Sequence, residues 1–219
     1  MGLGNQALIL KARGDLEGAM ALMKEQERIC RELGDPAGLQ RSLGNQALVL
    51  HARGNLEGAM ALMKEQECIC RGLGIQSSLQ VCLGNQAVIL KARGDLEGAM
   101  VLLKGQERIC RELGNLEGLQ GSLGNQANVL HVSGNLDAAM ALHGQEERIC
   151  RDLRDFTGLG IGLSNHAECL LEASRPTEAL PLIQESIELA RRLESPALER
   201  RMRLLKRIRA AIPAEPPDA

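Results

Sequence analysis

The sequence has almost no aromatic residues: Trp and Tyr are absent, and Phe156 is the single Phe among 219 residues. Because aromatic side chains supply much of the apolar area of ordinary cores, any core here consists of aliphatic, Met and Cys side chains. The same shortage excludes the stacking platforms that bind single-stranded nucleic acid. The formal net charge of −2 lacks the basic excess that phosphate binding requires, so we expect no nucleic-acid partner.

Long apolar runs are also missing. No stretch approaches the ~18 apolar residues that cross a bilayer, and the N-terminus shows no charged and then apolar leader. We therefore predict a cytoplasmic protein without a membrane partner.

The chain does contain a repeat with a period of 40 residues. The motif LGNQA begins at residues 3, 43, 83 and 123, and it returns at 163 as LSNHA. Residues 1–40 match residues 41–80 at 29 positions and residues 81–120 at 31 positions, without gaps. Modules of this size bury their apolar faces only against the next copy, which predicts a stacked array.

Each repeat has the pattern of two helices. In residues 37–74, the apolar positions 39, 43, 47 and 50 share one helical face, and Arg53, Gly54 and Asn55 interrupt that pattern. Gly supplies a left-handed helix end and Asn an N-cap, so a second helix begins here and stops at Gly74. We call the two predicted helices of a repeat helix A and helix B. The glycine of LGNQ lies inside helix A, where we interpret it as permitting close helix contact.

The small residues Ala7 and Ala19, the turn residue Gly14 and the segment ERICRELGD (27–35) resemble the tetratricopeptide repeat, in the longer variant of the Pins/LGN class. The resemblance covers roughly residues 1–195. It implies an all-α, right-handed α-solenoid of helix-turn-helix repeats whose concave face binds proteins. The sequence departs from the family at helix A places that are commonly Leu and here are Gln6, Gln46, Gln86 and Gln126.

The period predicts the domain organisation. Repeats span 1–40 with a truncated helix A, 41–80, 81–120, 121–160 and a divergent 161–195, followed by a basic capping helix at 196–212 and a disordered tail at 213–219. The basic helix also fits a membrane-surface or calmodulin-binding element, but every array needs a cap. The first repeat lacks one, which predicts either a fragment of a longer array or end-to-end self-association.

Metal and catalytic chemistry find little support in the sequence. Cys30, Cys70, Cys110 and Cys150 form a column whose members lie roughly 10 Å apart in stacked repeats, beyond disulfide reach, so we predict small buried side chains. His166 and Cys169 share a helical face but form only half of a zinc site. Motifs of the G-x-S-x-G and H-E-x-x-H types are absent. We predict no enzyme, no cofactor and no metal.

The candidate site is the flank of helix A that lines the concave groove in the resembling family. Its predicted residues are Asn5, Asn45, Asn85 and Asn125 with the equivalent Asn165, the groove residues Leu48, Val88 and Asn128, and the basic row Lys11, His51, Lys91 and His131. We call the Asn residues that recur once in each repeat the Asn ladder. Their spacing of roughly 10 Å matches the length of about three residues of extended peptide, to which an Asn amide can both donate and accept hydrogen bonds. Alternatively, these Asn side chains bridge helices internally. The basic row predicts an acidic ligand, or else it is an ordinary solvated face.

These observations predict a non-catalytic interaction scaffold or adaptor that binds a peptide segment of a partner protein, and the basic row favours an acidic segment. The alternative is a regulatory or sensing segment of a larger signalling protein, whose effector domain lies outside this chain.

Overall fold

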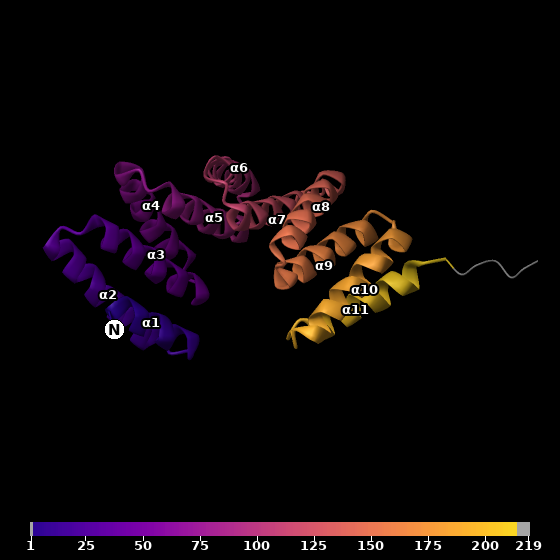
Figure 1. Ribbon diagram of the computed structural model, residues 1–219, viewed down its shortest axis with the longest axis horizontal. Helices are drawn as coiled ribbons and strands as arrows, with labels where there is room; N and C mark the ends of the chain where they lie inside the picture. The colour runs from indigo at the N-terminus through magenta and orange to yellow at the C-terminus, as the bar shows by residue number, and fades with distance from the viewer. Residues whose placement is uncertain (1, 214–219) are drawn as a thin grey trace, which may run out of the picture. The chain divides into compact units, whose positions relative to one another are not determined.

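The computed structural model describes residues 2–213, and every regular element in this range is a helix (Figure 1). The helices are α1 (Leu3–Ala12), α2 (Leu16–Leu33), α3 (Pro36–Ala52), α4 (Leu56–Leu73), α5 (Gln76–Ala92), α6 (Leu96–Leu113), α7 (Leu116–Val132), α8 (Leu136–Leu153), α9 (Phe156–Glu172), α10 (Pro176–Arg192) and α11 (Leu198–Ala211). The predicted all-α array of helix pairs is confirmed.

The helix ends follow from the residues that the sequence places there. The side chain of Asp35 accepts a hydrogen bond from the Gly38 amide at 2.9 Å and caps α3, and Asn55 caps α4 in the same way through the Gly58 amide. Gly74 ends α4 with a positive φ of 68°. Helix A starts about seven residues before LGNQA, so a structural pair such as α3–α4 spans residues 36–73 rather than 41–80.

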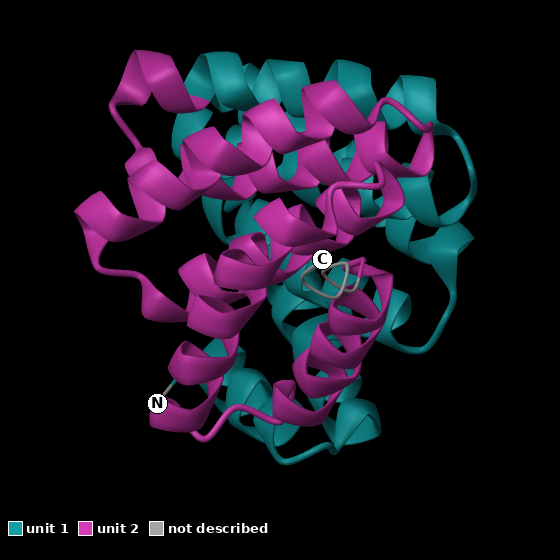
Figure 2. Ribbon diagram, turned by 90° about the vertical axis from the view of Figure 1, so that its right-hand side faces the viewer, with its two compact units in different colours: residues 1–109 teal, residues 110–219 magenta. Residues whose placement is uncertain are grey.

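The described chain divides into two compact units on either side of the Ile109–Cys110 bond (Figure 2). In the first unit, α1 to α5 each pack against the next helix along the chain. In the second unit, α7 to α11 do the same. Because each inner helix contacts both the helix before it and the helix after it, each unit is a short solenoid.

Burial between successive repeats holds each stack together. Val49 of α3 lies fully buried among Ala19 and Met23 of the preceding repeat, and Ile89 of α5 packs in the same way beside Met63. The A helices α3 and α5 thus each bury a β-branched side chain in the core of the preceding repeat. The predicted mode of neighbour-to-neighbour burial is the one observed.

The Gln residues that depart from the family pattern have specific partners. Gln46 donates to Glu27 of the preceding repeat at 2.7 Å, and Gln86 donates to Glu67 at 2.6 Å. Arg31 pairs with Glu27 at 2.8 Å, as the four-residue spacing predicts. A buried amide with a charged partner is satisfied, so these positions tolerate Gln without loss of packing.

The glycine of LGNQ permits a close approach of helix B. An ideal Cβ at residue 84 would lie 2.7 Å from Oε1 of Gln106, a distance that real Cβ atoms do not show. At Gly124 the corresponding distance to Glu146 is 2.5 Å. The interpretation of this glycine as a close-contact residue is confirmed.

The basic helix α11 packs against α10 and α9. Leu204, Leu205 and Ile208 are buried in one cluster with Ile183 and Ile187 of α10. Most of its cations are exposed, with Arg201 as the exception. No helix within residues 2–213 is both long and apolar enough to cross a membrane. The tail predicted at 213–219 lies, apart from Pro213, outside the described residues.

Candidate functional site

A cavity of about 310 Å³ opens between α3 and α5 in the first unit. Asn45, Leu48 and Asn85, three of the predicted groove residues, line it together. All three are half-buried. The two amides belong to equivalent positions of neighbouring repeats, so the cavity presents part of the predicted Asn ladder beside an apolar side chain.

The side-chain amides of Asn45 and Asn85 form no hydrogen bond to another side chain or to the backbone of another helix among residues 2–213. Internal bridging, the alternative reading of the ladder, holds at Asn165, which donates to Asn128 in the second unit at 3.3 Å. In the first unit the cavity-lining amides therefore keep their donors and acceptors for a ligand.

The other predicted residues lie away from this cavity. Asn5 is exposed on α1, Asn125 is half-buried on α7, and Val88 is half-buried on α5 without lining the cavity. The structure thus brings together only part of the predicted set.

The basic row is also not part of the cavity. Lys11, His51 and Lys91 are half-buried and form no ion pair within the described residues. His131 lies 2.8 Å from the Glu172 carboxylate of the next repeat, so its ring already has an anionic neighbour.

Arg41 is the cation that lines the cavity, and sequence reasoning missed it. Its column carries Arg, Val, Gly and Ile in successive repeats, so no repeated signal marked it. The available signal was its place one helical turn before Asn45, which puts both side chains on one face. Arg41 is exposed and has no ion-pair partner among residues 2–213.

A polar network forms the floor of the cavity. Gln66 of α4 donates to Gln40 at 3.2 Å, and Gln40 donates to Ser78 of α5 at 3.3 Å. The network links three helices at the site. The bond from Gln40 to Ser78 links the two rims of the cavity, α3 and α5, and the buried side chain of Gln66 ties α4 to α3.

A sequence model of the tetratricopeptide repeat family matches residues 40–65, the stretch that contains Asn45 and Leu48. Residues 1–40 and 81–120 are close copies of the repeat that contains this stretch, whereas residues 161–195 have diverged. Residues 40–65 belong to a tetratricopeptide repeat. The Pins/LGN variant remains a prediction, and a search of the curated proteins finds no significant match.

Solved structures share the fold of these tetratricopeptide repeats at low sequence identity. A kinesin light chain-like protein of Podospora anserina with nearly identical TPR-like repeats is 18% identical, with a TM-score of 0.72 over 88% of this chain and 94% of that one. A signal-transduction ATPase of Pyrococcus horikoshii with a tetratricopeptide repeat sensor is 13% identical, with a TM-score of 0.81 over 94% of this chain and 32% of that one. PlcR of Bacillus thuringiensis, in complex with a peptide and DNA, is 15% identical, with a TM-score of 0.70 over 90% of this chain and 71% of that one.

The junction between the fourth and fifth tetratricopeptide repeats carries three titratable side chains that the other junctions lack, His143, Glu146 and His166, beside Glu147, whose position is Glu in every earlier repeat. His143 of α8 is fully buried and lies 2.9 Å from Glu146, and His166 of α9 lies 2.7 Å from Glu147. The two imidazole rings stack with centroids 6.1 Å apart. His143 replaces the Met or Leu of earlier repeats, while Glu146 and His166 each replace a Gln.

The structure separates the two residues of the predicted half zinc site. His166 turns to Glu147, whereas Cys169 lies in the apolar cluster beneath α11. Within residues 2–213, no group of three or more His, Cys, Asp or Glu side chains is arranged to hold a metal ion.

The thiols differ sharply in exposure, which predicts a simple labelling pattern. All seven cysteines are free, and Cys68 is the exposed one. Burial raises the pKa of Cys82 to about 11 and that of Cys150 to about 12, so these groups stay protonated at neutral pH. Since the thiolate is the reactive form, we expect one fast-reacting thiol per native chain with Ellman's reagent, and none in Cys68→Ser. Any fast-reacting thiol in Cys68→Ser would contradict the burial described here.

Proposed function

We propose that this tetratricopeptide array is a non-catalytic protein-interaction module, and that its cavity between α3 and α5 binds an extended segment of a partner protein. The observation that carries the proposal is the pair of unpartnered amides of Asn45 and Asn85, which line the same cavity from α3 and α5. An Asn amide both donates to and accepts from a peptide main chain, so two of them at successive repeats hold an extended backbone.

The cavity also supports a preference for the side chains of the bound segment. Leu48 and the exposed Val81 supply apolar contact, which favours an apolar residue between the two amides. Arg41 adds an unpaired cation at the edge, which favours an acidic residue next to it. The proposed ligand is an extended segment with an apolar residue and an acidic neighbour.

The test uses peptides selected from a random display library on the intact chain, measured by isothermal titration calorimetry. Each Asn hydrogen bond to a backbone contributes about 1 kcal/mol net. Asn45→Ala/Asn85→Ala is therefore expected to weaken binding by roughly 30-fold. Asn5→Ala, in the same column but away from the cavity, is the matched control and is expected to bind as the parent does.

Two charge variants test which cations contact the acidic residue of the bound peptide. Arg41→Glu is expected to weaken acidic peptides about tenfold, and Lys91→Glu tests the basic row. If the selected peptides bind Asn45→Ala/Asn85→Ala as tightly as the parent chain, the proposed groove is wrong. Weakening by Lys91→Glu alone would move the acidic contact from Arg41 to the basic row.

A second candidate function is a regulatory or sensing segment of a larger signalling protein. It is favoured by the likeness to the Pyrococcus horikoshii ATPase, in which the matched region is a third of a chain that has a tetratricopeptide repeat sensor. An NTPase, kinase or protease domain in frame with this array in its gene would decide for the sensing role. An open reading frame that encodes the repeats alone would decide against it.

A further inference from the structure

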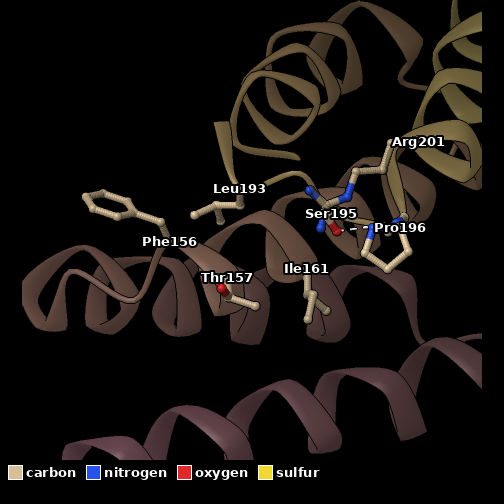
Figure 3. Close-up of a pocket in the computed structure, with 8 residues that line it drawn as sticks. Phe156, Thr157, Ile161, Leu193, Ser195, Pro196 and Arg201 are labelled. Carbon is tan, nitrogen blue, oxygen red and sulfur yellow. Dashed lines mark hydrogen bonds between the residues drawn. The ribbon is translucent and has the colours of Figure 1, made fainter. Parts of the chain in front are cut away.

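A second cavity, of about 250 Å³, lies in the second unit where α9 begins and the chain passes from α10 into α11 (Figure 3). Its walls include the apolar side chains of Phe156, Ile161, Leu193 and Pro196. Arg201 of α11 lines the same cavity and extends toward Leu193 and Ser195 in Figure 3. This cavity lies in a different unit from the proposed peptide groove and is independent of it.

Arg201 is a buried cation without an anionic partner. The residue is 5% exposed, and its Nη1 donates to the backbone carbonyl of Ser186 at 2.8 Å. No carboxylate within residues 2–213 pairs with it, whereas its neighbours Arg200 and Arg207 both pair with Glu168. A guanidinium stays charged in proteins, and buried charges are normally paired, so this one lacks an expected partner.

The environment of Arg201 adds further positive potential. Burial lowers the pKa of Arg201 because it disfavours the charged guanidinium. Repulsion from the charge of Arg200 lowers the pKa further. The N-cap of α11 is Ala197, which provides no side-chain acceptor for the first turn of the helix. Since Ser195, Pro196 and Ala197 line the cavity, the positive end of the α11 dipole lies at its rim.

Two small residues leave space for this guanidinium. In the earlier repeats the corresponding positions hold Gln40 and Gln66, which hydrogen bond to each other. Here they are Gly160 and Ser186, and an ideal Cβ at residue 160 would lie 2.9 Å from Nη1 of Arg201. The two smaller residues thus admit a cation where Gln40 with Gln66, and Gln80 with Gln106, form a neutral pair.

We propose that this cavity binds a small carboxylate with an apolar body. The carboxylate accepts hydrogen bonds from Arg201 at the start of α11, and the apolar body contacts Ile161 and Leu193. A volume of about 250 Å³ equals roughly eight waters at ~30 Å³ each, which suits a chain of about six carbons. The same chemistry is offered by a free carboxylic acid and by the terminal carboxylate of a peptide that ends in an apolar residue.

The test is an NMR titration of the intact, ¹⁵N-labelled chain with hexanoate and with hexan-1-ol, which shares the apolar body but carries no charge. We expect hexanoate to shift the amide signals of Gly160, Ser195 and Ala197 in a saturable way, and to bind at least about tenfold more tightly than hexan-1-ol. Arg201→Met is expected to remove that preference, and Arg200→Met, at the exposed neighbour, is expected to retain it.

The tripeptide Ala-Ala-Leu, with a free and with an amidated C-terminus, distinguishes the two sources of the carboxylate. If the free tripeptide binds more tightly than hexanoate, the site is assigned to a peptide end. If it binds more weakly, the site is assigned to a small acid.

Ile161→Glu keeps the test decisive if Arg201→Met does not fold. Ile161 is half exposed, so the substitution is compatible with the fold, and it adds a carboxylate to the lining of the cavity that Arg201 also lines. We expect a higher Tm and loss of hexanoate binding, because the internal carboxylate occupies the site. Equal binding of hexanoate and hexan-1-ol, no saturable shift up to roughly 10 mM, or unchanged hexanoate binding by Ile161→Glu would each overturn the proposal.

Discussion

Replacement of His143 by Met is expected to lower the free energy of unfolding by about 3–5 kcal/mol, although Met occupies the same position in two other repeats. His143 is fully buried, and its Nδ1 lies 2.9 Å from the carboxylate of Glu146, which is itself buried. Met cannot hydrogen bond to that carboxylate. The substitution therefore leaves a buried carboxyl group without its hydrogen-bond partner, and this loss outweighs the gain in apolar packing.

The double variant His143→Met/Glu146→Gln is expected to recover this loss and to be up to ~1–4 kcal/mol more stable than the parent. It restores the Met and Gln pair found at Met63 and Gln66, where the same backbone positions are packed without titratable groups. Nε2 of His143, which is buried without a hydrogen-bond partner, is removed at the same time. The two substitutions should therefore show a large coupling energy.

Urea unfolding followed by far-ultraviolet circular dichroism measures both variants, since the chain has no Trp for fluorescence. Arg148→Met, on the exposed face of the same helix, is the control and is expected to change the unfolding free energy by less than about 0.5 kcal/mol. If His143→Met alone is as stable as the parent, then the buried pair contributes nothing to the fold. Additive effects of the two substitutions would also contradict the contact.

The helix pairs were predictable because their signals are local. Gly54 and Asn55, for example, mark the turn between α3 and α4 within a few residues, and the 40-residue period repeats that signal. Such features need no knowledge of which residues meet across repeats.

The site was predictable only in part, because its contacts depend on register between helices. The Gln46 and Glu27 side chains meet across 19 residues, and no spacing rule within one helix marks that pair. His131 was expected in a free basic row, but its partner Glu172 belongs to the divergent fifth repeat, where the column pattern fades. Nothing in the basic segment 196–212 distinguishes Arg201 from the other cations, because its burial depends on the small residues Gly160 and Ser186 on other helices.

Truncation of Ile208 to Ala is expected to destabilise the second unit by about 2–5 kcal/mol. Ile208 is fully buried and lies in the same cluster as Ile183 and Ile187, the apolar face of α10 that α11 covers. In a repeat array the last helix pair has no further copy to bury this face, so the cap helix takes that role. Loss of three side-chain carbons there leaves a cavity at the contact that holds α11 in place.

Native-state hydrogen exchange shows where this loss acts. We expect Ile208→Ala to lower protection in α11 and α10 first, with α7 and α8 less affected, because each repeat is stabilised mainly by its neighbours. Arg209→Ala, at the next and exposed position of α11, is the matched control and should leave protection unchanged. Uniform loss of protection from α7 to α11 would mean that the second unit unfolds as one body, and protection equal to the parent would mean that α11 does not stabilise the array.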